Sequence, residues 1–452
     1  MTRLEQAFLG GASSLRIRRY ALLCAGALAL SACVFLDAKK QQAKLDEFCA
    51  IEGRVSAERR EQKPIVVVLV RKIGSDLDRR ESWEIADHFV LEGPGRWAFR
   101  ASADTYGLVA FQDMNADLKV QQDEPYLRLD AGKLLECKPG GAHKDIALVI
   151  PAAGRPRFGG EFDIAALQAR TIHQQMQVSL GQLTALGQIA SLADPRFADK
   201  VAENSLWRPF DFIIDGYAGV YFLEAYDAAK TPVLFVHGIN GSPANFRRLV
   251  ERMDRRQFQP WVYYYPSGAH LAAVADHLTQ GMRNLQLRHG FRQFAVVAHS
   301  MGGLVSRGFV LRYETPGSRA AIPLYVTIAT PWGGHKGAQT GVDTAPVVVR
   351  VWEDMAPGSA YLRELFYSDP ATRKQHRALP RGTPHHLLFT YKQSGVSMGE
   401  AADGTVTVSS QLDWSAQLDA ARLYGFNETH MGVLESAAAS ALLNDLLAKV
   451  GG

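Results

Sequence analysis

The sequence predicts an α/β fold, a mostly parallel sheet flanked by helices, preceded by a small β-sandwich domain. From Trp207 onward, short apolar runs alternate with segments whose apolar residues recur every three or four positions, the pattern of alternating strands and helices. From Cys49 to about Pro151 the chain shows only short strand-like runs separated by turn residues. Alternating strands and helices form parallel sheets, so we expect functional side chains on loops at the carboxyl ends of the strands.

The second half of the chain, residues 207–452, is expected to form one domain. The expected strands are Gly219–Tyr226, Val233–Val236, Trp261–Tyr265, Phe294–Ala298, Leu324–Ala329, His386–Tyr391 and Arg422–Tyr424, and the expected helices are Pro243–Met253, Leu271–His289, Gly302–Leu311 and Glu435–Val450. A long segment rich in apolar residues, about residues 335–384, lies between two of these strands. We expect it to form a cap over the site, although its apolar residues also fit a simple helical core.

The first 32 residues predict export. Three arginines within residues 16–19 precede an apolar run from Tyr20 to Leu30, which is too short for a comfortable transmembrane helix. The sequence Leu-Ser-Ala-Cys at residues 30–33 resembles a bacterial lipobox. The resemblance implies a signal peptide at residues 1–32 and a lipid on Cys33; a plain secretory signal is the alternative.

The residues after Cys33 are expected to be a polar tether, residues 33–48. Val34 directly after Cys33 resembles outer-membrane sorting signals, which implies a bacterial cell envelope location with the chain anchored by lipid in the outer membrane. In an oxidising compartment Cys49 and Cys137 are expected to form a disulfide, worth about 4 kcal/mol if unstrained. Two free buried thiols are the alternative.

The β-sandwich expected at residues 49–151 contains an acidic loop with metal-ligand spacing. Positions 1, 3, 5, 7, 9 and 12 of an EF-hand-like loop are occupied by Asp113, Asn115, Asp117, Lys119, Gln121 and Glu124. Position 6 is Leu118 rather than the glycine that the sharp turn of such a loop requires. Two interpretations follow: a structural calcium site, or a solvated turn whose acidic side chains cap backbone N–H groups, which we favour.

Residues 152–206 are expected to be a linker followed by a helical segment. Residues 152–163 are rich in glycine and proline. Apolar side chains then recur at helical intervals at Ile172, Met176, Leu180, Leu183, Leu186 and Ile189, although Gly181 and Gly187 weaken the pattern. Asp194-Pro195 should end the helix.

Ser300 is the candidate nucleophile. It lies between the expected strand Phe294–Ala298 and the expected helix Gly302–Leu311, so it should occupy a sharp strand-to-helix turn that exposes its hydroxyl at the sheet edge. The strained turn requires small residues two positions before and after the serine, which here are Ala298 and Gly302. A small-x-Ser-x-Gly pattern is common by chance, so the assignment depends on the other loops.

Three further loops carry residues that suit acyl transfer. The loop at residues 237–243, directly after a strand, could supply the backbone N–H of Ile239, which with that of Met301 would stabilise an oxyanion. Asp403 lies after a later strand, where a carboxylate could orient an imidazole; Asp-Gly is also a common turn pair, and Asp413 is the fallback acid. His430, after the last strand, is the expected general base.

The order of these residues carries the functional assignment. Nucleophile, acid and base follow one another as Ser300, Asp403 and His430, each after a strand. Together with His237-Gly238 and residues 329–334 (Ala-Thr-Pro-Trp-Gly-Gly), these motifs resemble lipase-type α/β-hydrolases, in particular bacterial triacylglycerol lipases and the GPI-inositol deacylase-like group. The resemblance covers about Trp207 to the C-terminus and departs at Ala298, where many members have glycine.

The resemblance implies an esterase or lipase that cleaves carboxylic esters through an acyl-enzyme, with an acyl-ester or lipid as substrate. Phospholipid deacylation, acyl transfer and a catalytically inactive surface-binding lipoprotein are the alternatives. No cofactor is expected to be required, apart from the calcium considered for the acidic loop, because the first strand lacks a phosphate-binding glycine loop. The net charge of +4 is nearly balanced and no basic stripe occurs, so nucleic acid is not expected as a partner.

Overall fold

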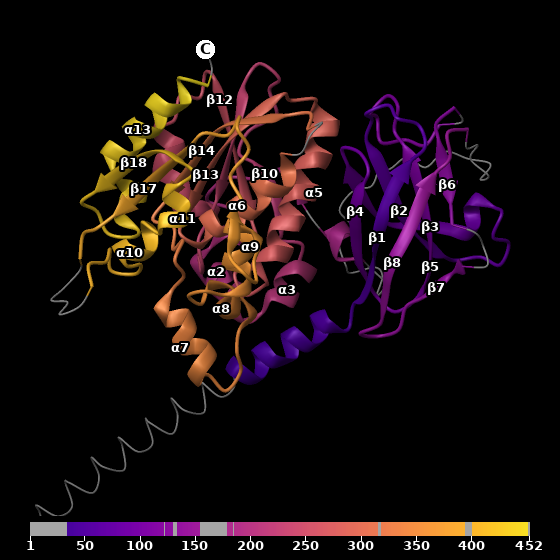
Figure 1. Ribbon diagram of the computed structural model, residues 1–452, viewed down its shortest axis with the longest axis horizontal. Coiled ribbons are helices and arrows are strands. Elements are labelled where there is room, and N and C mark those ends of the chain that lie inside the picture. The colour runs from indigo at the N-terminus through magenta and orange to yellow at the C-terminus, as the bar shows by residue number, and fades with distance from the viewer. Residues whose placement is uncertain are drawn as a thin grey trace, which may run out of the picture.

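The computed structural model describes residues 34–121, 123–129, 133–153, 179–183, 185–314, 318–393 and 400–450. Two parts lie side by side, a larger α/β part and a smaller all-β part formed by the first third of the chain (Figure 1). The signal-peptide prediction for residues 1–32, Cys33 and most of the predicted linker lie outside the described residues. Among the helices that are described, none is both long enough and apolar enough to span a bilayer.

The α/β part is built on an eight-stranded sheet. Its spatial order is β18-β17-β14-β13-β11-β12-β10-β9. In chain order the strands are β9 (Ala185–Ile189), β10 (Gly219–Phe222), β11 (Thr231–Val236), β12 (Phe258–Tyr264), β13 (Gln293–His299), β14 (Ala321–Ile328), β17 (His385–Thr390) and β18 (Ala420–Phe426). The pairs are parallel except for β10 with β12. With this order and its helical layers the chain has the α/β-hydrolase fold.

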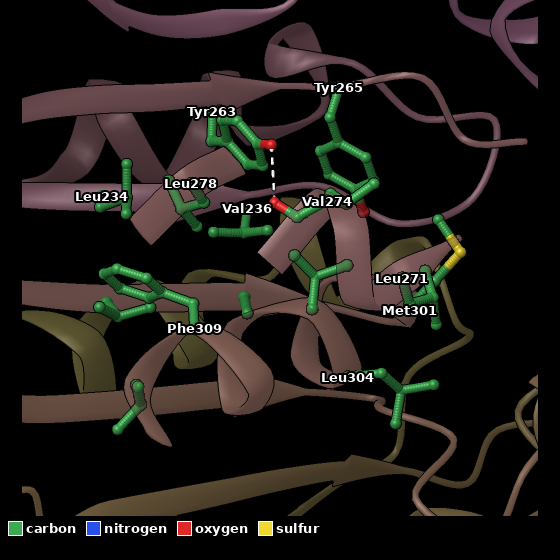
Figure 2. Packing of buried hydrophobic residues seen from close by; sticks show 14 of the residues in the cluster. Leu234, Val236, Tyr263, Tyr265, Leu271, Val274, Leu278, Met301, Leu304 and Phe309 are labelled. Carbon is green, nitrogen blue, oxygen red and sulfur yellow. Dashed lines mark hydrogen bonds between the residues drawn. The ribbon is translucent and has the colours of Figure 1, made fainter. Parts of the chain in front are cut away.

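Helices cover both faces of this sheet. They are α2 (Asp199–Trp207), α3 (Pro209–Ile214), α4 (Arg247–Arg252), α5 (Leu271–His289), α6 (Met301–Tyr313), α10 (Val408–Gln411), α11 (Trp414–Gln417), α12 (Gly432–Glu435) and α13 (Ala437–Leu447). Two buried clusters result, one on each face. In the first, Leu278 of α5 and Leu304 and Phe309 of α6 pack against strand residues such as Val236 (Figure 2). Burial of this apolar surface holds helices and sheet together and fixes the strand ends in space.

The predicted cap region connects β14 to β17. It contains α7 (Lys336–Thr344), α8 (Arg350–Met355), α9 (Ala360–Phe366), β15 (Tyr367–Asp369) and β16 (Lys374–His376). Its apolar residues Val351, Leu365 and Phe366 are buried in the first cluster, so the segment is packed onto the domain. Asp354 of α8 accepts a hydrogen bond from the backbone N–H of Leu271, 2.7 Å away, which fixes α8 beside the loop after β12.

The all-β part consists of two sheets. One has the order β4-β1-β8 and the other β3-β2-β5-β6, with β7 paired to β5. The strands are β1 (Cys49–Ala57), β2 (Ile65–Lys72), β3 (Trp83–Leu91), β4 (Gly95–Ala101), β5 (Thr105–Gln112), β6 (Tyr126–Arg128), β7 (Leu135–Glu136) and β8 (Ala142–Ile150). Ile51 and Trp97 from the first sheet and Val67 and Leu108 from the second share one buried cluster. A disulfide joins Cys49 to Cys137 across 88 residues, as the sequence predicts.

The edge of β3 is closed by helix α5 of the α/β part. The side-chain amide of Gln280 accepts a hydrogen bond from the N–H of Val90 at 2.9 Å and donates one to its carbonyl at 3.2 Å. One glutamine thus replaces a neighbouring strand at that position. Because unpaired strand edges invite pairing with other chains, this contact both protects the sheet and ties the two parts together.

The prediction of a helix around residues 180–189 is wrong for the residues of this range that the structure describes. Leu180–Leu183 is a single 3-10 turn (η4), and Ala185–Ile189 is the edge strand β9, paired in parallel with β10. Gly187 has φ +75°, which a helix does not allow but glycine adopts readily. Tertiary pairing with β10 therefore overrides the helical spacing of the apolar residues; Ile172 and Met176 lie outside the described residues.

The predicted polar tether is also wrong as a description of residues 34–46, which form a helix. Ala38 and Gln41 of this helix are buried, and Phe35 lies edge-on to Trp207 with ring centroids 5.5 Å apart. In Figure 1 the helix lies along one end of the α/β part, near α7 and α8. Polarity misled the prediction because the residues that this helix buries are an alanine and a glutamine rather than large apolar residues.

Candidate active site

Ser300 occupies a strained turn between β13 and α6. Its φ of 53° and ψ of −130° lie outside the regions that side-chain-bearing residues ordinarily adopt. A Cβ on Gly302 would lie 2.3 Å from the carbonyl oxygen of Val236, so the turn needs glycine there because strand and helix backbones approach so closely. This is the packing that the small-residue pattern predicts, and it raises the Ser300 hydroxyl at the carboxyl end of the sheet.

The structure brings Ser300, His430 and Asp403 together. Nε2 of His430 lies 2.9 Å from Oγ of Ser300, and Nδ1 of His430 lies 2.8 Å from Oδ2 of Asp403. The two loops are also joined through the backbone, because the N–H of His430 donates to the carbonyl of Asp403 at 3.0 Å. Residues 130 and 27 positions apart in the chain thus form one hydrogen-bonded line.

Asp403 is fully buried and surrounded by hydrogen-bond donors. Its Oδ1 accepts from the N–H groups of Thr405 and Val406, at 3.0 and 2.7 Å. Its Oδ2 accepts from Thr390 Oγ1 at 2.6 Å and from Gln411 Nε2 at 3.1 Å, besides His430. Burial by itself raises the pKa of Asp403, but the hydrogen bond and charge of His430, with those from Thr390 and Val406, outweigh it and hold this pKa below its ordinary value.

An ionised Asp403 determines which nitrogen of His430 carries the proton. A carboxylate can only accept hydrogen bonds, so Nδ1 of His430 must donate to it. Nε2 is then left with a lone pair directed at the Ser300 hydroxyl. In this tautomer the imidazole can take the serine proton, and the carboxylate stabilises the imidazolium that forms.

Thr390 and Gln411 are residues of the site that the sequence did not reveal. Gln411 is fully buried; its Oε1 accepts from the N–H of Thr390 at 2.8 Å and its Nε2 donates to the carbonyl of Thr390 at 3.0 Å. Gln411 therefore fixes the end of β17 and also positions Asp403. No motif marks either residue, because the glutamine lies on a short helix eight positions after the aspartate and meets it only in the fold.

The loop after β11 lies against the nucleophile. A Cβ on Gly238 would lie 2.8 Å from the Cβ of Ser300, so only glycine allows this approach. Asn240 has φ 54°, and its N–H donates to Ser267 Oγ at 3.0 Å, which fixes the loop. Within the described part of the chain, the N–H groups of Ile239 and Met301 have no hydrogen-bond acceptor. These are the two groups expected to bind an oxyanion.

The two histidines nearest in sequence to the site motifs have structural roles. His237 is fully buried and stacked on Tyr265; burial lowers its pKa to about 4. His299 hydrogen-bonds through Nε2 to the carbonyl of His430, 2.9 Å away, and burial, followed by the nearby charge of His430, lowers its pKa to about 3. Both rings therefore stay neutral at neutral pH and support the loops that hold Ser300 and His430.

The fallback acid does not take part in the line of hydrogen bonds. Asp413 caps α11, its Oδ1 accepting from the N–H of Ser415 at 2.9 Å. Among the remaining histidines, His385 bonds to Thr327 and His335 to the carbonyl of Thr405. The structure thus singles out Asp403 and His430 as the partners of Ser300.

The acidic loop of the all-β part is a tightly capped turn. Asp113 accepts from the N–H groups of Asp117 and Leu118, Asp117 from Lys119, and Glu124 from Met114 and Gln121, at distances from 2.7 to 3.2 Å. Ala116 and Leu118 have positive φ, which builds the turn without glycine. Within the described residues, one group of three His, Cys, Asp or Glu side chains has ligand atoms close enough together to hold a metal ion. It consists of Cys49, Cys137 and His143, and its two cysteines form the disulfide. The turn interpretation thus describes the geometry, and calcium binding remains a prediction.

Comparisons with known proteins found remote likenesses only. No protein-family model and no curated protein matches the chain. Among solved structures, the mature lipase BlEst2 of Bacillus licheniformis is 17% identical, with 50% of this chain and 94% of that chain covered and a TM-score of 0.37. Lipase B of Aspergillus fumigatus is 14% identical over 51% and 55% of the two chains, with a TM-score of 0.37. Phospholipase PlaB of Legionella pneumophila is 19% identical over 40% and 45%, with a TM-score of 0.30.

The fold assignment rests on the molecule itself rather than on these likenesses. Strand order, the antiparallel position of β10 and the turn at Ser300 define the chain as a protein of the α/β-hydrolase fold. The resemblance in the sequence named the same fold. The all-β part and the helix of residues 34–46 are additions that this resemblance does not cover.

Proposed function

We propose that the chain is a serine hydrolase that cleaves carboxylic esters through an acyl-enzyme. The observation that carries the proposal is the continuous line from Ser300 through His430 to Asp403, with contacts of 2.9 and 2.8 Å, beside two unengaged backbone N–H groups. Nucleophile, base, acid and oxyanion donors are thereby placed within reach of one acyl carbon.

In the first half of the reaction, His430 Nε2 takes the hydroxyl proton as Ser300 Oγ attacks the ester carbonyl carbon. The carbonyl oxygen becomes an oxyanion and accepts hydrogen bonds from the N–H groups of Ile239 and Met301. His430 then gives its proton to the alcohol oxygen, the bond from the acyl carbon to that oxygen breaks, and the acyl group remains on Ser300.

In the second half, water replaces the alcohol. His430 accepts a proton from the water as it attacks the acyl carbon, and the same two N–H groups bind the second oxyanion. The imidazolium returns its proton to Ser300 Oγ, and the carboxylic acid leaves. Ser300 and His430 expose only 4% and 6% of their surfaces, so bulk solvent competes little for the hydrogen bond between them.

The proposed substrates are lipid-like acyl esters, and the proposed location is the bacterial envelope. The apolar segment between β14 and β17 lies next to the site, and the lipobox-like residues before Val34 support a lipid anchor on Cys33, in the outer membrane. Hydrolysis is proposed rather than acyl transfer; product analysis with an added acceptor alcohol distinguishes the two.

The test is hydrolysis of a series of p-nitrophenyl esters by the purified chain. We expect wild type to turn over these esters and to be labelled at Ser300 by a fluorophosphonate, and Ser300→Ala to lose both properties. Ser306→Ala, which removes a buried hydroxyl of α6 bonded to Tyr325, is the matched control and should keep activity. Equal rates for wild type and Ser300→Ala would exclude the proposal.

A further inference from the structure

The helix of residues 34–46 is attached to the α/β part by contacts along its length. Near its start, Phe35 packs on Trp207 and Asp37 pairs with Arg208 at 3.3 Å. In its middle, Gln41 Oε1 accepts from the N–H of Asp211 at 2.9 Å. Toward its end, Gln42 donates to the carbonyl of Val348 at 3.0 Å and Asp46 pairs with Arg350 at 2.5 Å. The helix therefore touches both α2–α3 and the cap region.

A short series of packing contacts and hydrogen bonds connects this helix to the candidate active site. Trp207, which Phe35 contacts, ends α2, and Ser205 in the same helical turn accepts a hydrogen bond from the N–H of Ser267 at 3.2 Å. Ser267 Oγ in turn accepts from the N–H of Asn240, beside the expected oxyanion donor Ile239. The helix is thus fixed on the end of the sheet that carries Ser300, the carboxyl ends of the parallel strands.

The side of the helix that faces away from the α/β part is exposed and combines a large apolar residue with two lysines. Leu36 is 59% exposed, an unusual degree for a large apolar residue. Lys39 and Lys40, three and four positions after Leu36, are exposed on the same side. In the described residues, neither lysine has an ion-pair partner. An apolar residue next to unpaired lysines matches the boundary between acyl chains and anionic headgroups.

The chain that precedes this helix supplies a second, independent observation. Residues 20–30 are an apolar run, and Cys33 ends a lipobox-like sequence, directly before Val34. A lipid on Cys33, which the lipobox-like sequence implies, would enter a bilayer directly next to Val34. The exposed side of the helix then lies at the membrane surface.

We propose that residues 34–46 form a docking surface for an anionic phospholipid bilayer and hold the Ser300 end of the sheet toward it. This rests on the proposed function and names its substrate source: esters in the bilayer to which the chain is anchored. Thirteen residues as a free tether would reach about 45 Å, whereas as a helix they span about 20 Å and are fixed to the domain. The helix therefore sets orientation as well as distance.

The experiment compares two substrates and two vesicle compositions. The full chain is reconstituted in vesicles of phosphatidylcholine alone or with phosphatidylglycerol, each containing a fluorogenic acyl ester; a water-soluble p-nitrophenyl ester reports the site itself. We expect the wild type to hydrolyse the vesicle ester faster when the vesicle is anionic. In Lys39→Glu/Lys40→Glu this preference should fall by more than about thirtyfold, since losing each basic residue at an anionic surface costs about a factor of five and the two glutamates add repulsion. The soluble rate should not change.

The matched control is Lys138→Glu/Lys144→Glu, which makes the same charge change at exposed lysines of the all-β part. It should keep the anionic preference. Leu36→Gln should weaken hydrolysis on both vesicle types while leaving the soluble rate intact. The docking proposal is overturned if Lys39→Glu/Lys40→Glu keeps the wild-type preference with a normal soluble rate, whereas failure of wild type on the soluble ester would instead overturn the proposed function.

Discussion

Two acidic turns, one in each part of the molecule, contain carboxylates that accept backbone N–H groups, but these carboxylates have different further partners. In the turn at Asp403, one carboxylate oxygen accepts two backbone N–H groups, and the other meets Thr390, Gln411 and His430 from elsewhere in the chain. In the turn at residues 113–124, the oxygens of Glu124 accept N–H groups of the same turn. The carboxylate of Asp403 thus contacts the imidazole of His430, whereas that of Glu124 contacts backbone N–H groups of its own turn.

The pKa values of the two carboxyl groups differ accordingly. That of Asp403 is lowered, because hydrogen bonds and the charge of His430 outweigh burial. Burial raises that of Glu124 to about 7, since its two backbone donors compensate less and Asp113 and Asp117 add repulsion. Similar burial therefore accompanies opposite pKa shifts, and the difference comes from the contact of Asp403 with His430, a residue from a distant part of the sequence.

The largest expected effect comes from removing the charge of Asp403. Asp403→Asn keeps the shape but presents an amide N–H or a neutral oxygen to His430, so the imidazole loses the partner that fixes its tautomer and stabilises its protonated form. We expect kcat to fall about 10⁴-fold with little change in KM. Ester hydrolysis measures it, and circular dichroism checks that the fold is retained.

Asp413→Asn is the control for that substitution. Asp413 caps α11 nearby and is not bonded to His430, so the variant should keep kcat within a small factor. A large loss of kcat in Asp413→Asn with a modest one in Asp403→Asn would reverse the assignment of the acid.

A smaller effect is expected when one of the supporting donors is removed. Thr390→Val deletes the hydroxyl that donates to Asp403 Oδ2 at 2.6 Å, but Gln411 and two backbone N–H groups remain. We expect kcat to fall about tenfold with KM unchanged, the size of one hydrogen bond to a charged group. Thr340→Val, at an exposed helix position, is the control and should leave kcat unchanged. An unchanged kcat in Thr390→Val would contradict the role of its hydroxyl in holding Asp403.

The sequence predicted the parts of the fold that have strong local signals. The strands with β-branched apolar runs and the helix Leu271–His289, ended by Gly290, are where the periodicity placed them. Ser300, Asp403 and His430 were predicted because their order along the chain is informative. Thr390 and Gln411 could not be, since a threonine at a strand end and a glutamine on a short helix carry no signal until the fold joins them.

The two errors share a cause. Residues 185–189 have helical spacing, yet they pair with β10, and residues 34–46 look like a solvated tether, yet they pack on α2 and the cap. In both, contacts with distant residues determine the conformation, and a local pattern contains no information about them.

The stability of the turn at residues 113–124 is expected to depend on pH. Because the folded pKa of Glu124 is about 7 against an ordinary 4.5, the folded state binds its proton more tightly than the unfolded state does. This group's contribution to the free energy of unfolding therefore falls as pH rises from about 4.5 to about 7. Hydrogen exchange of β5 peptides should show protection decreasing over that window.

Glu124→Gln should remove this slope. The amide still accepts one backbone N–H but turns its NH₂ group toward the other, so the variant should lose about 1–3 kcal/mol at low pH, where wild type is protonated and most stable. Flat protection in wild type across the same window would contradict the pKa argument. Asp117→Asn is a graded comparison: it removes only the weakest contribution to the raised pKa of Glu124, so it should reduce the slope slightly without abolishing it.

The smallest expected effect concerns calcium. A calcium site needs several oxygens directed at one point, but in the turn at residues 113–124 the carboxylates of Asp113 and Glu124 are already engaged by backbone N–H groups. Binding would have to break these bonds, so we expect the melting temperature to be the same in millimolar calcium and in chelator. A rise with calcium that disappears in Glu124→Gln would show that the turn rearranges around a metal, and that its charge, like that of Asp403, has a partner beyond its own backbone.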